Sequence, residues 1–520
     1  MKNYFKYMAI LALGVVSCEA DFENSIEDQN FYAKGQADFS NYVALGNSLT
    51  AGYADGALYI TGQENAYPKL VANQFSLVQD TEEFTIPYVN DNAGGLTLGG
   101  NVIADTRYVL AVGAAGPSPQ RYRGAAPTTE VTNTLEGPFN NMGVPGAKSF
   151  HLVAEGYGNV AGVPGGVANP YFARFATSPG TSVIKDALMQ EPTFFSLWIG
   201  NNDVLGYATS GGVGVDQTNN TDPSTYGPND ITDPNVFGSV YSQMVENLSA
   251  SASGGVLINI PDVTSVPYFT AVPNDALDLE AEQAAQLTAY FQAVSQIFAA
   301  GLMQKGVPQE QAAALAAQYA ISFKADENRF LIDVPKTEMN PLGFRQMTEE
   351  ELLLLTIDRT ALAQGYGSVM LTPEVMQVLG KLQQGQQPTE AEAELVINAV
   401  SGIDDKDALD KEELGKIEAA TNAYNATISA LAEANGLALV DANAVLDKLA
   451  GEGIQVNGTI LTDEFGTGGA FSLDGIHLTP RGNAVIANEM IMEVNATYGS
   501  EVPMLDPGNF GTITYNNEVQ

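Results

Sequence analysis

The chain has 520 residues, of which 45% are hydrophobic, a length that fits one large domain with insertions or two domains. The formal net charge is −39 and no basic face is visible, which argues against nucleic acid as a partner and against tight electrostatic docking on anionic membranes. The acidic residues are spread along the chain, which is typical of a soluble surface in a salty or extracellular setting.

The first 18 residues are typical of an export signal. Lys2 and Lys6 precede an apolar run over residues 7–16, which is too short to span a bilayer, and Cys18 follows. Because Cys18 is the only cysteine, the sequence excludes an internal disulfide and a thiolate metal site.

A lone cysteine at the end of a signal peptide resembles the lipoprotein signals of bacteria. It resembles in particular those of the Bacteroidetes, in which the residues directly before the cysteine follow the usual pattern less strictly. The resemblance implies that Cys18 is lipidated and anchors the mature chain to a membrane. We therefore expect an exported lipoprotein at the outer membrane or cell surface of a Gram-negative bacterium. The alternative is a cleaved secretory peptide with an incidental cysteine.

The chain that follows the signal begins with a tether. Residues 19–38 are polar and acidic, which predicts little structure of their own. The folded part opens with an apolar run over residues 42–45 that stops at Gly46, the pattern of a buried strand ending in a turn. Residues 66–75 have a helical pattern. Residues 76–140 are rich in Gly, Pro, Thr and Asn without a helical period, which predicts an irregular, partly β excursion.

Strand-like and helix-like segments alternate along the rest of the chain. A Gly/Pro turn at residues 141–150 leads into a helix, and apolar runs that end in polar turns predict strands within residues 193–203 and 254–263. The remaining elements that we expect are helices at residues 182–192, 241–252 and 411–436, and a strand with a short helix at residues 437–451.

This order of elements indicates an α/β fold. Nearly all-apolar strands that alternate with helices are typical of a parallel sheet flanked by helices in three layers. Residues 39–270 and 406–500 are expected to form this domain. Residues 271–405 have mostly helical patterns and are interpreted as a mainly helical insertion, and residues 501–520 as a polar tail.

Polar turns at the ends of the predicted strands are the candidate sites, because ligands of parallel sheets bind outside the carboxyl ends of the strands. Ser48 lies between a strand and a helix, where it could act as a nucleophile whose own N–H helps to hold an oxyanion. The N–H of Gly146 can approach a ligand because glycine has no side chain. Asn202 can donate its amide N–H to an oxyanion. Each of the three alone is explained as well by a helix cap or a turn.

Asp474 and His477 form the fourth candidate. If this segment curls as one turn, the carboxylate reaches the Nδ1–H of the imidazole and leaves Nε2 free to take a proton from a hydroxyl. A structural histidine satisfied by a local carboxylate is the alternative. The only other histidine, His151, is expected to pack against a helix. Two histidines and one cysteine leave no plausible zinc site, and residues 404–410 lack the central glycine of a calcium loop.

Taken together, the four blocks resemble the SGNH, or GDSL-type, hydrolase family. The motifs are Gly-Asn-Ser-Leu at residues 46–49, Ile-Gly-Asn-Asn-Asp at residues 199–203 and Asp-Gly-Ile-His-Leu-Thr-Pro at residues 474–480, with the Gly146 turn between the first two. The resemblance covers roughly residues 41–498 without the excursion and the insertion, and it implies a flavodoxin-like fold. The first block is usually Gly-Asp-Ser-Leu; here Asn47 replaces the aspartate and Ser48 stays in place.

The resemblance also implies a role for each residue. Ser48 is the nucleophile, His477 the general base and Asp474 the group that orients it. The oxyanion hole is formed by the N–H groups of Ser48 and Gly146 and by the amide of Asn202. Neither a metal nor a cofactor is needed.

The family includes lipases, short-chain esterases, thioesterases and deacetylases of polysaccharides. We therefore expect a serine-dependent carboxylic ester hydrolase acting on a lipid, glycan or small-molecule ester. A polysaccharide deacetylase, an acyltransferase and an inactive glycan- or lipid-binding protein on the same scaffold remain alternatives. The leucine run at residues 351–355 suggests that the insertion is a lid with an acyl groove, or else a cap packed on the core.

Overall fold

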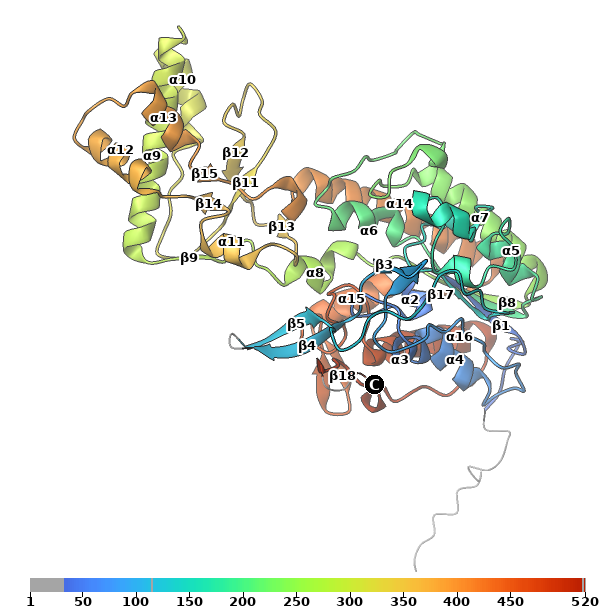
Figure 1. Ribbon diagram of the computed structural model, residues 1–520. Coiled ribbons are helices and arrows are strands. Elements are labelled where there is room, and N and C mark those ends of the chain that lie inside the picture. Colours follow the sequence, from blue (N-terminus) through green and yellow to red (C-terminus); the bar gives the residue numbers. More distant parts are fainter. Residues whose placement is uncertain (1–31, 114–115, 517–518, 520) are drawn as a thin grey trace, which may run out of the picture.

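The computed structural model describes residues 32–113, 116–516 and 519 (Figure 1). The expected signal peptide, Cys18 and the first part of the expected tether lie outside these residues. Within the described part of the chain, no helix has both the length and the apolar character needed to cross a membrane.

A five-stranded sheet forms the centre of the main body, and all of its strand pairs are parallel. In spatial order the strands are β6 (Asn141–Gly143), β1 (Tyr42–Gly46), β7 (Phe194–Trp198), β8 (Gly254–Ile258) and β17 (Ala438–Val440). Every residue of β1, β7 and β8 is buried, as expected for strands with both faces covered. The expectation of an α/β fold with a parallel sheet flanked by helices is therefore confirmed.

The order of the strands identifies where a ligand would bind. Numbered by their appearance in the chain, the five strands run 2-1-3-4-5 across the sheet, so the order reverses between β1 and β7. In open parallel sheets the crevice at such a reversal, outside the carboxyl ends of the strands, is the usual ligand site. β6 was not expected, because residues 141–150 predict only a turn; its three residues form a strand by pairing with β1.

Helices cover both faces of this sheet. Figure 1 shows α4 and α16 on one face and α7 and α14 on the other. Their bounds are Tyr67–Phe75 for α4, Pro480–Tyr498 for α16, Pro234–Ser251 for α7 and Lys411–Asn435 for α14. Local signals explain the ends of the long helix α14. Asp410 and Glu413 form a capping box at its start, and Gly436 ends it in the left-handed conformation.

The predicted excursion over residues 76–140 contains two β-hairpins. One is formed by β2 (Leu96–Leu98) and β3 (Asn101–Ala104), the other by β4 (Tyr108–Gly113) and β5 (Gly116–Arg121). The second hairpin projects from the main body (Figure 1). The C-terminal segment packs beside it, since the Leu110 N–H donates a hydrogen bond to the Thr514 carbonyl.

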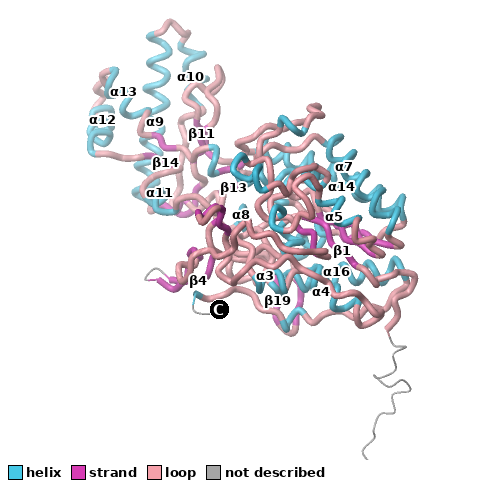
Figure 2. Tube along the Cα trace, turned by 45° about the vertical axis from the view of Figure 1, so that its right-hand side comes forward, coloured by secondary structure: helices cyan, strands magenta, loops and turns pink. Residues whose placement is uncertain are grey.

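The insertion stands apart from the main body in both views (Figure 1, Figure 2). It has an apolar core of its own, in which Tyr290 and Phe291 of α9 (Ala281–Gln304) pack with Phe344. Its other helices are α10 (Gln309–Ala317), α11 (Arg359–Ala363), α12 (Pro373–Gln383) and α13 (Glu390–Ile397). Three two-stranded sheets accompany these helices: β9 (Leu277–Leu279) with β10 (Asp326–Asn328), β11 (Leu331–Asp333) with β12 (Phe344–Gln346), and β14 (Ser368–Val369) with β15 (Val400–Ser401). Strands of two or three residues are too short to give a sequence period, so the expectation of a mainly helical segment misses them.

The base of the insertion is joined to the main body. β13 (Leu352–Leu353) pairs with β16 (Ala408–Leu409), and Leu354 and Leu409 are buried in the main core. Residues 351–355 therefore form a packed junction between the two parts of the chain.

Candidate active site

Ser48 lies where β1 passes into the four-residue helix α2 (Ser48–Ala51). Asn47 caps this helix, accepting a 3.0 Å hydrogen bond from the Leu49 N–H on its side-chain oxygen. The turn is tight because it follows Gly46, where an added Cβ would lie 2.4 Å from the Trp198 carbonyl oxygen. Ser48 is 8% exposed, at the carboxyl end of β1.

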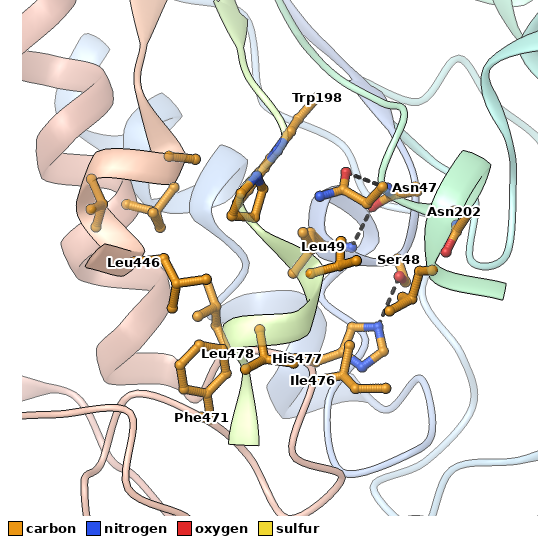
Figure 3. Close-up of a pocket in the computed structure, with 18 of the residues that line it drawn as sticks. Asn47, Ser48, Leu49, Trp198, Asn202, Leu446, Phe471, Ile476, His477 and Leu478 are labelled. Atoms are coloured by element: carbon orange, nitrogen blue, oxygen red, sulfur yellow. Dashed lines mark hydrogen bonds between the residues drawn. The ribbon is translucent and has the colours of Figure 1, made fainter. Parts of the chain in front are cut away.

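His477 and Asp474 meet Ser48 from the other end of the chain. The Nε2 atom of His477 lies 2.8 Å from the Ser48 hydroxyl oxygen, and its Nδ1 atom lies 2.9 Å from Oδ2 of Asp474. A carboxylate on Nδ1 places the ring proton there and leaves Nε2 as the acceptor of the serine proton. Figure 3 shows the contact between Ser48 and His477. The structure thus brings the three residues into one hydrogen-bonded chain.

The Asp474 carboxylate is held by four donors besides the imidazole. Oδ1 accepts from the N–H groups of His477 (2.8 Å) and Ile476 (2.9 Å) and from the Ser472 hydroxyl (3.1 Å), and Oδ2 accepts from the Gly56 N–H (2.8 Å). Burial by itself would raise the pKa of this carboxyl. The charge of His477 and these hydrogen bonds outweigh burial and hold the pKa of Asp474 well below its usual range. Asp474 is therefore ionised throughout the neutral and mildly acidic range.

A buried ion pair supports the turn that carries Asp474 and His477. Oδ2 of Asp55 lies 2.7 Å from Nη2 of Arg107, and the two side chains are 6% and 3% exposed. Asp55 also accepts a 3.0 Å hydrogen bond from the Leu473 N–H, and its own N–H donates to the Ser472 hydroxyl at 2.9 Å. Sequence reasoning missed these residues, since nothing in the chain pairs a charge at position 55 with a turn 418 residues away.

Asn202 is placed by β7 as Ser48 is placed by β1. It is the first residue of α6 (Asn202–Thr209), and its amide Nδ2 donates one hydrogen bond to the Ala147 carbonyl oxygen at 2.9 Å. An amide nitrogen carries two hydrogens, so the second remains for a ligand. Ser48, Asn202 and His477 all line one pocket.

The predicted backbone donors are the N–H groups of Ser48 and Gly146, and only Ser48 lines the pocket. Among the described residues, neither the Ser48 N–H nor the Gly146 N–H donates a hydrogen bond to a protein acceptor. Gly146 has φ +79° with open space around the position of a Cβ, so its N–H can be approached. It does not line the pocket that Ser48, Asn202 and His477 share, although the carbonyl oxygen of the next residue, Ala147, accepts the hydrogen bond from Asn202.

Asn47 has a second partner that sequence reasoning missed. Its Nδ2 donates a 2.9 Å hydrogen bond to Oδ1 of Asn201, and both side chains are buried. The bond ties the turn after β1 to the turn after β7, which are the turns that carry Ser48 and Asn202. An aspartate at position 47 could accept the cap hydrogen bond but has no hydrogen to give to Asn201.

Two hollows adjoin the His477 ring. The first is an apolar pocket of about 70 Å³ that extends from Ser48 toward α15 (Ala442–Ala450). Figure 3 shows Leu446, Phe471 and Leu478 gathered on one side of Ser48 in this pocket. The second is a groove that shares His477 with the first hollow and is lined by Tyr53, whose ring centroid lies 4.8 Å from the imidazole, and by residues of the β4–β5 hairpin and the insertion.

His151 lies outside this site, in the segment where the sequence predicts a helix. It belongs to a 3₁₀ turn, accepts a hydrogen bond from the Lys148 N–H at 3.0 Å and stacks on Tyr157 with ring centroids 4.6 Å apart. Burial lowers the pKa of His151 to about 4. Across the described ranges, no three His, Cys, Asp or Glu side chains gather as a metal site.

Comparisons with protein-family models, with curated proteins and with solved structures find no match to this chain.

Proposed function

We propose that the protein is a serine-dependent carboxylic ester hydrolase of the SGNH, or GDSL, type. The observation that carries the proposal is the hydrogen-bonded chain from the Ser48 hydroxyl through the His477 ring to Asp474. The 2-1-3-4-5 strand order, which is that of flavodoxin-like sheets, supports it, because Ser48 and Asn202 follow the two strands between which the order reverses.

The reaction has two steps. The Ser48 hydroxyl oxygen bonds to the ester carbonyl carbon while Nε2 of His477 takes its proton. His477 then gives this proton to the alcohol oxygen as the carbon–oxygen bond to the alcohol breaks, which leaves an acyl-Ser48. Water attacks the acyl group through the same base, and the proton returns to Ser48 as the acid leaves. Asp474 stabilises the imidazolium in both steps.

The negative oxygen of each intermediate needs donors that are free before the reaction. The unpaired N–H groups of Ser48 and Gly146 and the second amide hydrogen of Asn202 fit this need. Because Asn202 is fixed by its hydrogen bond to Ala147, its amide is already oriented before the substrate arrives. Such preorganised donors are usually the largest single contribution to acyl transfer.

The apolar pocket indicates what kind of acyl group the enzyme accepts. Beyond the polar groups at its mouth, it is lined by aliphatic and aromatic side chains, including Trp198, Leu446 and Phe471. Each methylene buried in such a pocket contributes about 0.8 kcal/mol, so a longer acyl chain binds better until the pocket is full. This favours acyl groups larger than acetyl. No residue of the insertion lines the pocket, so the proposed acyl site does not include the leucine run of the insertion.

The test is hydrolysis of p-nitrophenyl esters from acetyl to palmitoyl by the purified mature chain. We expect rates that rise with chain length beyond acetyl and vanish in Ser48→Ala. The surface variant Ser224→Ala is the matched control, and covalent trapping of the wild type by an alkyl phosphonate verifies the nucleophile. Equal activity of Ser48→Ala and wild type would move the nucleophile elsewhere. Absence of Ser48-dependent cleavage and trapping would favour a binding protein.

A pocket-filling variant tests the acyl assignment separately. Leu446 is 4% exposed and lines the pocket from α15. Leu446→Trp is expected to reduce kcat/KM for long esters by about tenfold or more, because several methylenes lose their site, while acetyl ester cleavage changes little. An equal loss for all chain lengths would show that the pocket does not hold the acyl chain.

A further inference from the structure

The groove beside His477 is built from parts of the chain that lie far apart in sequence. Tyr108 and Arg121 come from the β4–β5 hairpin, Leu355 and Arg359 from the insertion, and Tyr268 from the segment before it. Figure 1 and Figure 2 show the hairpin and the insertion on the same side of the main body. The groove therefore lies where the β4–β5 hairpin and the insertion meet the turn that carries Asp474 and His477, here called the catalytic turn.

Two cations line this groove without a carboxylate partner among the described residues. Arg121 lies with its guanidinium carbon 3.9 Å from the centre of the Tyr108 ring and uses Nη1 to donate to the Gly56 and Thr106 carbonyl oxygens. Arg359 is exposed, and its side chain has no hydrogen bond or ion pair within the described ranges. The chain has 22 basic against 61 acidic residues, so most of its surface repels anions. The groove reverses this locally.

No free carboxylate competes for these cations. The only acidic residue that lines the groove is Asp474, whose oxygens are occupied by His477 and the four other donors described above. A guanidinium presents several N–H donors in a plane, a geometry that suits the oxygens of a phosphate or a carboxylate. Arg121 uses Nη1 for the two carbonyl oxygens, so the donors on its other nitrogens remain for a ligand.

The proposed reaction places one half of the ester in this groove. His477 must reach the alcohol oxygen to protonate it, and the apolar pocket takes the acyl half, so the groove, which His477 also lines, is left for the alcohol half. We infer that the alcohol half of the substrate carries an anionic group, a phosphate or a carboxylate, which Arg121 and Arg359 bind. The inference rests on the proposed ester hydrolysis and specifies its substrate as an apolar acyl ester of an anionic alcohol.

The position of Arg359 is fixed relative to the catalytic turn. The Leu355 N–H donates to the Tyr268 carbonyl oxygen at 2.7 Å, and the Tyr268 N–H donates to the Gly475 carbonyl oxygen at 2.9 Å. Gly475 lies between Asp474 and His477, so the start of the Arg359 segment is two hydrogen bonds from the triad. The insertion thereby contributes to binding of the alcohol.

The test compares esters that share one acyl chain and differ in the alcohol: a monoacylglycerol, its 3-phosphate and an acyl glycerate. At low salt, we expect kcat/KM for at least one anionic ester to exceed that for the neutral ester by about tenfold, and the ratio to fall as salt screens the charges. The anionic ester with the larger ratio identifies the bound group. A ratio near one, or in favour of the neutral ester, would overturn the inference while ester hydrolysis stands.

Variants assign the effect to the groove. Arg359→Gln, at an exposed position, is expected to lower the ratio about two- to fivefold, and Arg121→Gln about tenfold. Arg123→Gln is the matched control, because Arg123 is exposed, pairs with Asp105 and does not line the groove. Arg121→Gln also removes hydrogen bonds that hold the hairpin, so its folding is checked by thermal unfolding and Arg359→Gln decides alone if it fails. An unchanged ratio in Arg359→Gln would overturn the inference, and no cleavage of any of the three esters would contradict the proposed function itself.

Discussion

Replacing Asp474 by asparagine tests whether the carboxylate sets the tautomer of His477. The substitution keeps the shape of the side chain and exchanges one oxygen for an NH₂ group. In the wild type, both oxygens only accept, from the His477 ring and Gly56 on one side and from Ile476, His477 and Ser472 on the other. An asparagine must therefore bring two hydrogens toward groups that are themselves donors.

The two orientations of the new amide are not equivalent. With NH₂ in the place of Oδ1, it faces the fixed N–H groups of Ile476 and His477. With NH₂ in the place of Oδ2, it faces only one fixed N–H, that of Gly56, and the imidazole. We expect the second orientation, in which the amide donates to Nδ1 and the ring proton moves to Nε2. A ring with its proton on Nε2 cannot accept the proton of Ser48.

The magnitudes follow from these contacts. Loss of the correct tautomer lowers kcat by roughly 10⁴ in serine proteases with an aspartate-to-asparagine change, and we expect a similar loss here. The conflict with Gly56 and the weaker hydrogen bonds of a neutral group lower the free energy of unfolding by about 2–4 kcal/mol. The loss of activity is thus expected to exceed anything that partial unfolding explains.

Three measurements check this result. Initial rates give kcat, urea unfolding gives stability, and ring ¹⁵N NMR gives the tautomer. The chain has only two histidines, so the ring of His151 serves as the internal reference for the NMR signals of His477. Asp105→Asn, at an exposed ion pair, is the control. Turnover within about tenfold of wild type, or a proton that stays on Nδ1 of His477, would refute the reasoning.

Three other variants probe separate parts of the molecule. Asn202→Ala is expected to lower kcat by about 10² to 10³ with little change in KM; wild-type turnover would make Asn202 a turn residue only. Asn47→Ala removes a helix cap and leaves the buried Oδ1 of Asn201 unpaired. Urea unfolding is therefore expected to show a free energy of unfolding that is lower by about 2 to 4 kcal/mol. A decrease below about 1 kcal/mol would contradict this. His151 has a folded pKa of about 4 and an unfolded pKa near 6.5, so the unfolded chain takes up the proton first as pH falls. Its contribution to stability therefore falls by about 2 kcal/mol between pH 7 and pH 5, and His151→Phe is expected to lose that much less than wild type over this range; equal losses would refute the assignment.

The strands that could be predicted are those whose character is local. β1, β7, β8 and β17 are apolar runs bounded by turn residues, and burial of both faces gives them this composition. β6 has no such signal. Asn141–Gly143 becomes a strand only because Ala44 and its neighbours pair with it, which is a contact between residues about a hundred positions apart. The short sheets of the insertion were missed because strands of two or three residues are too short to give a sequence period.

The site divides in the same way. The sequence motifs of three turns are enough to identify Ser48, Asn202, Asp474 and His477 as candidates. The structure brings these four residues together. The residues that hold them do not stand out. In sequence Asp55 and Arg107 are two charges among many, and only the fold shows that they are buried together behind the catalytic turn. The role of Asn47 in joining two turns is likewise visible only when β1 and β7 lie side by side.

The turn that carries Asp474 and His477 is held by two other segments of the chain, and one of them leads into the insertion. The loop after α2 binds the turn through Asp55 and Gly56. Tyr268, just before the insertion, binds it through Gly475, where φ is +74° and an added Cβ would lie 3.0 Å from both the Tyr268 nitrogen and the Leu355 side chain. A side chain at position 475 would therefore separate the insertion from the turn. The base of the insertion thus adjoins the proposed active site, whereas its outer part has a core of its own that is separate from Ser48, Asp474 and His477.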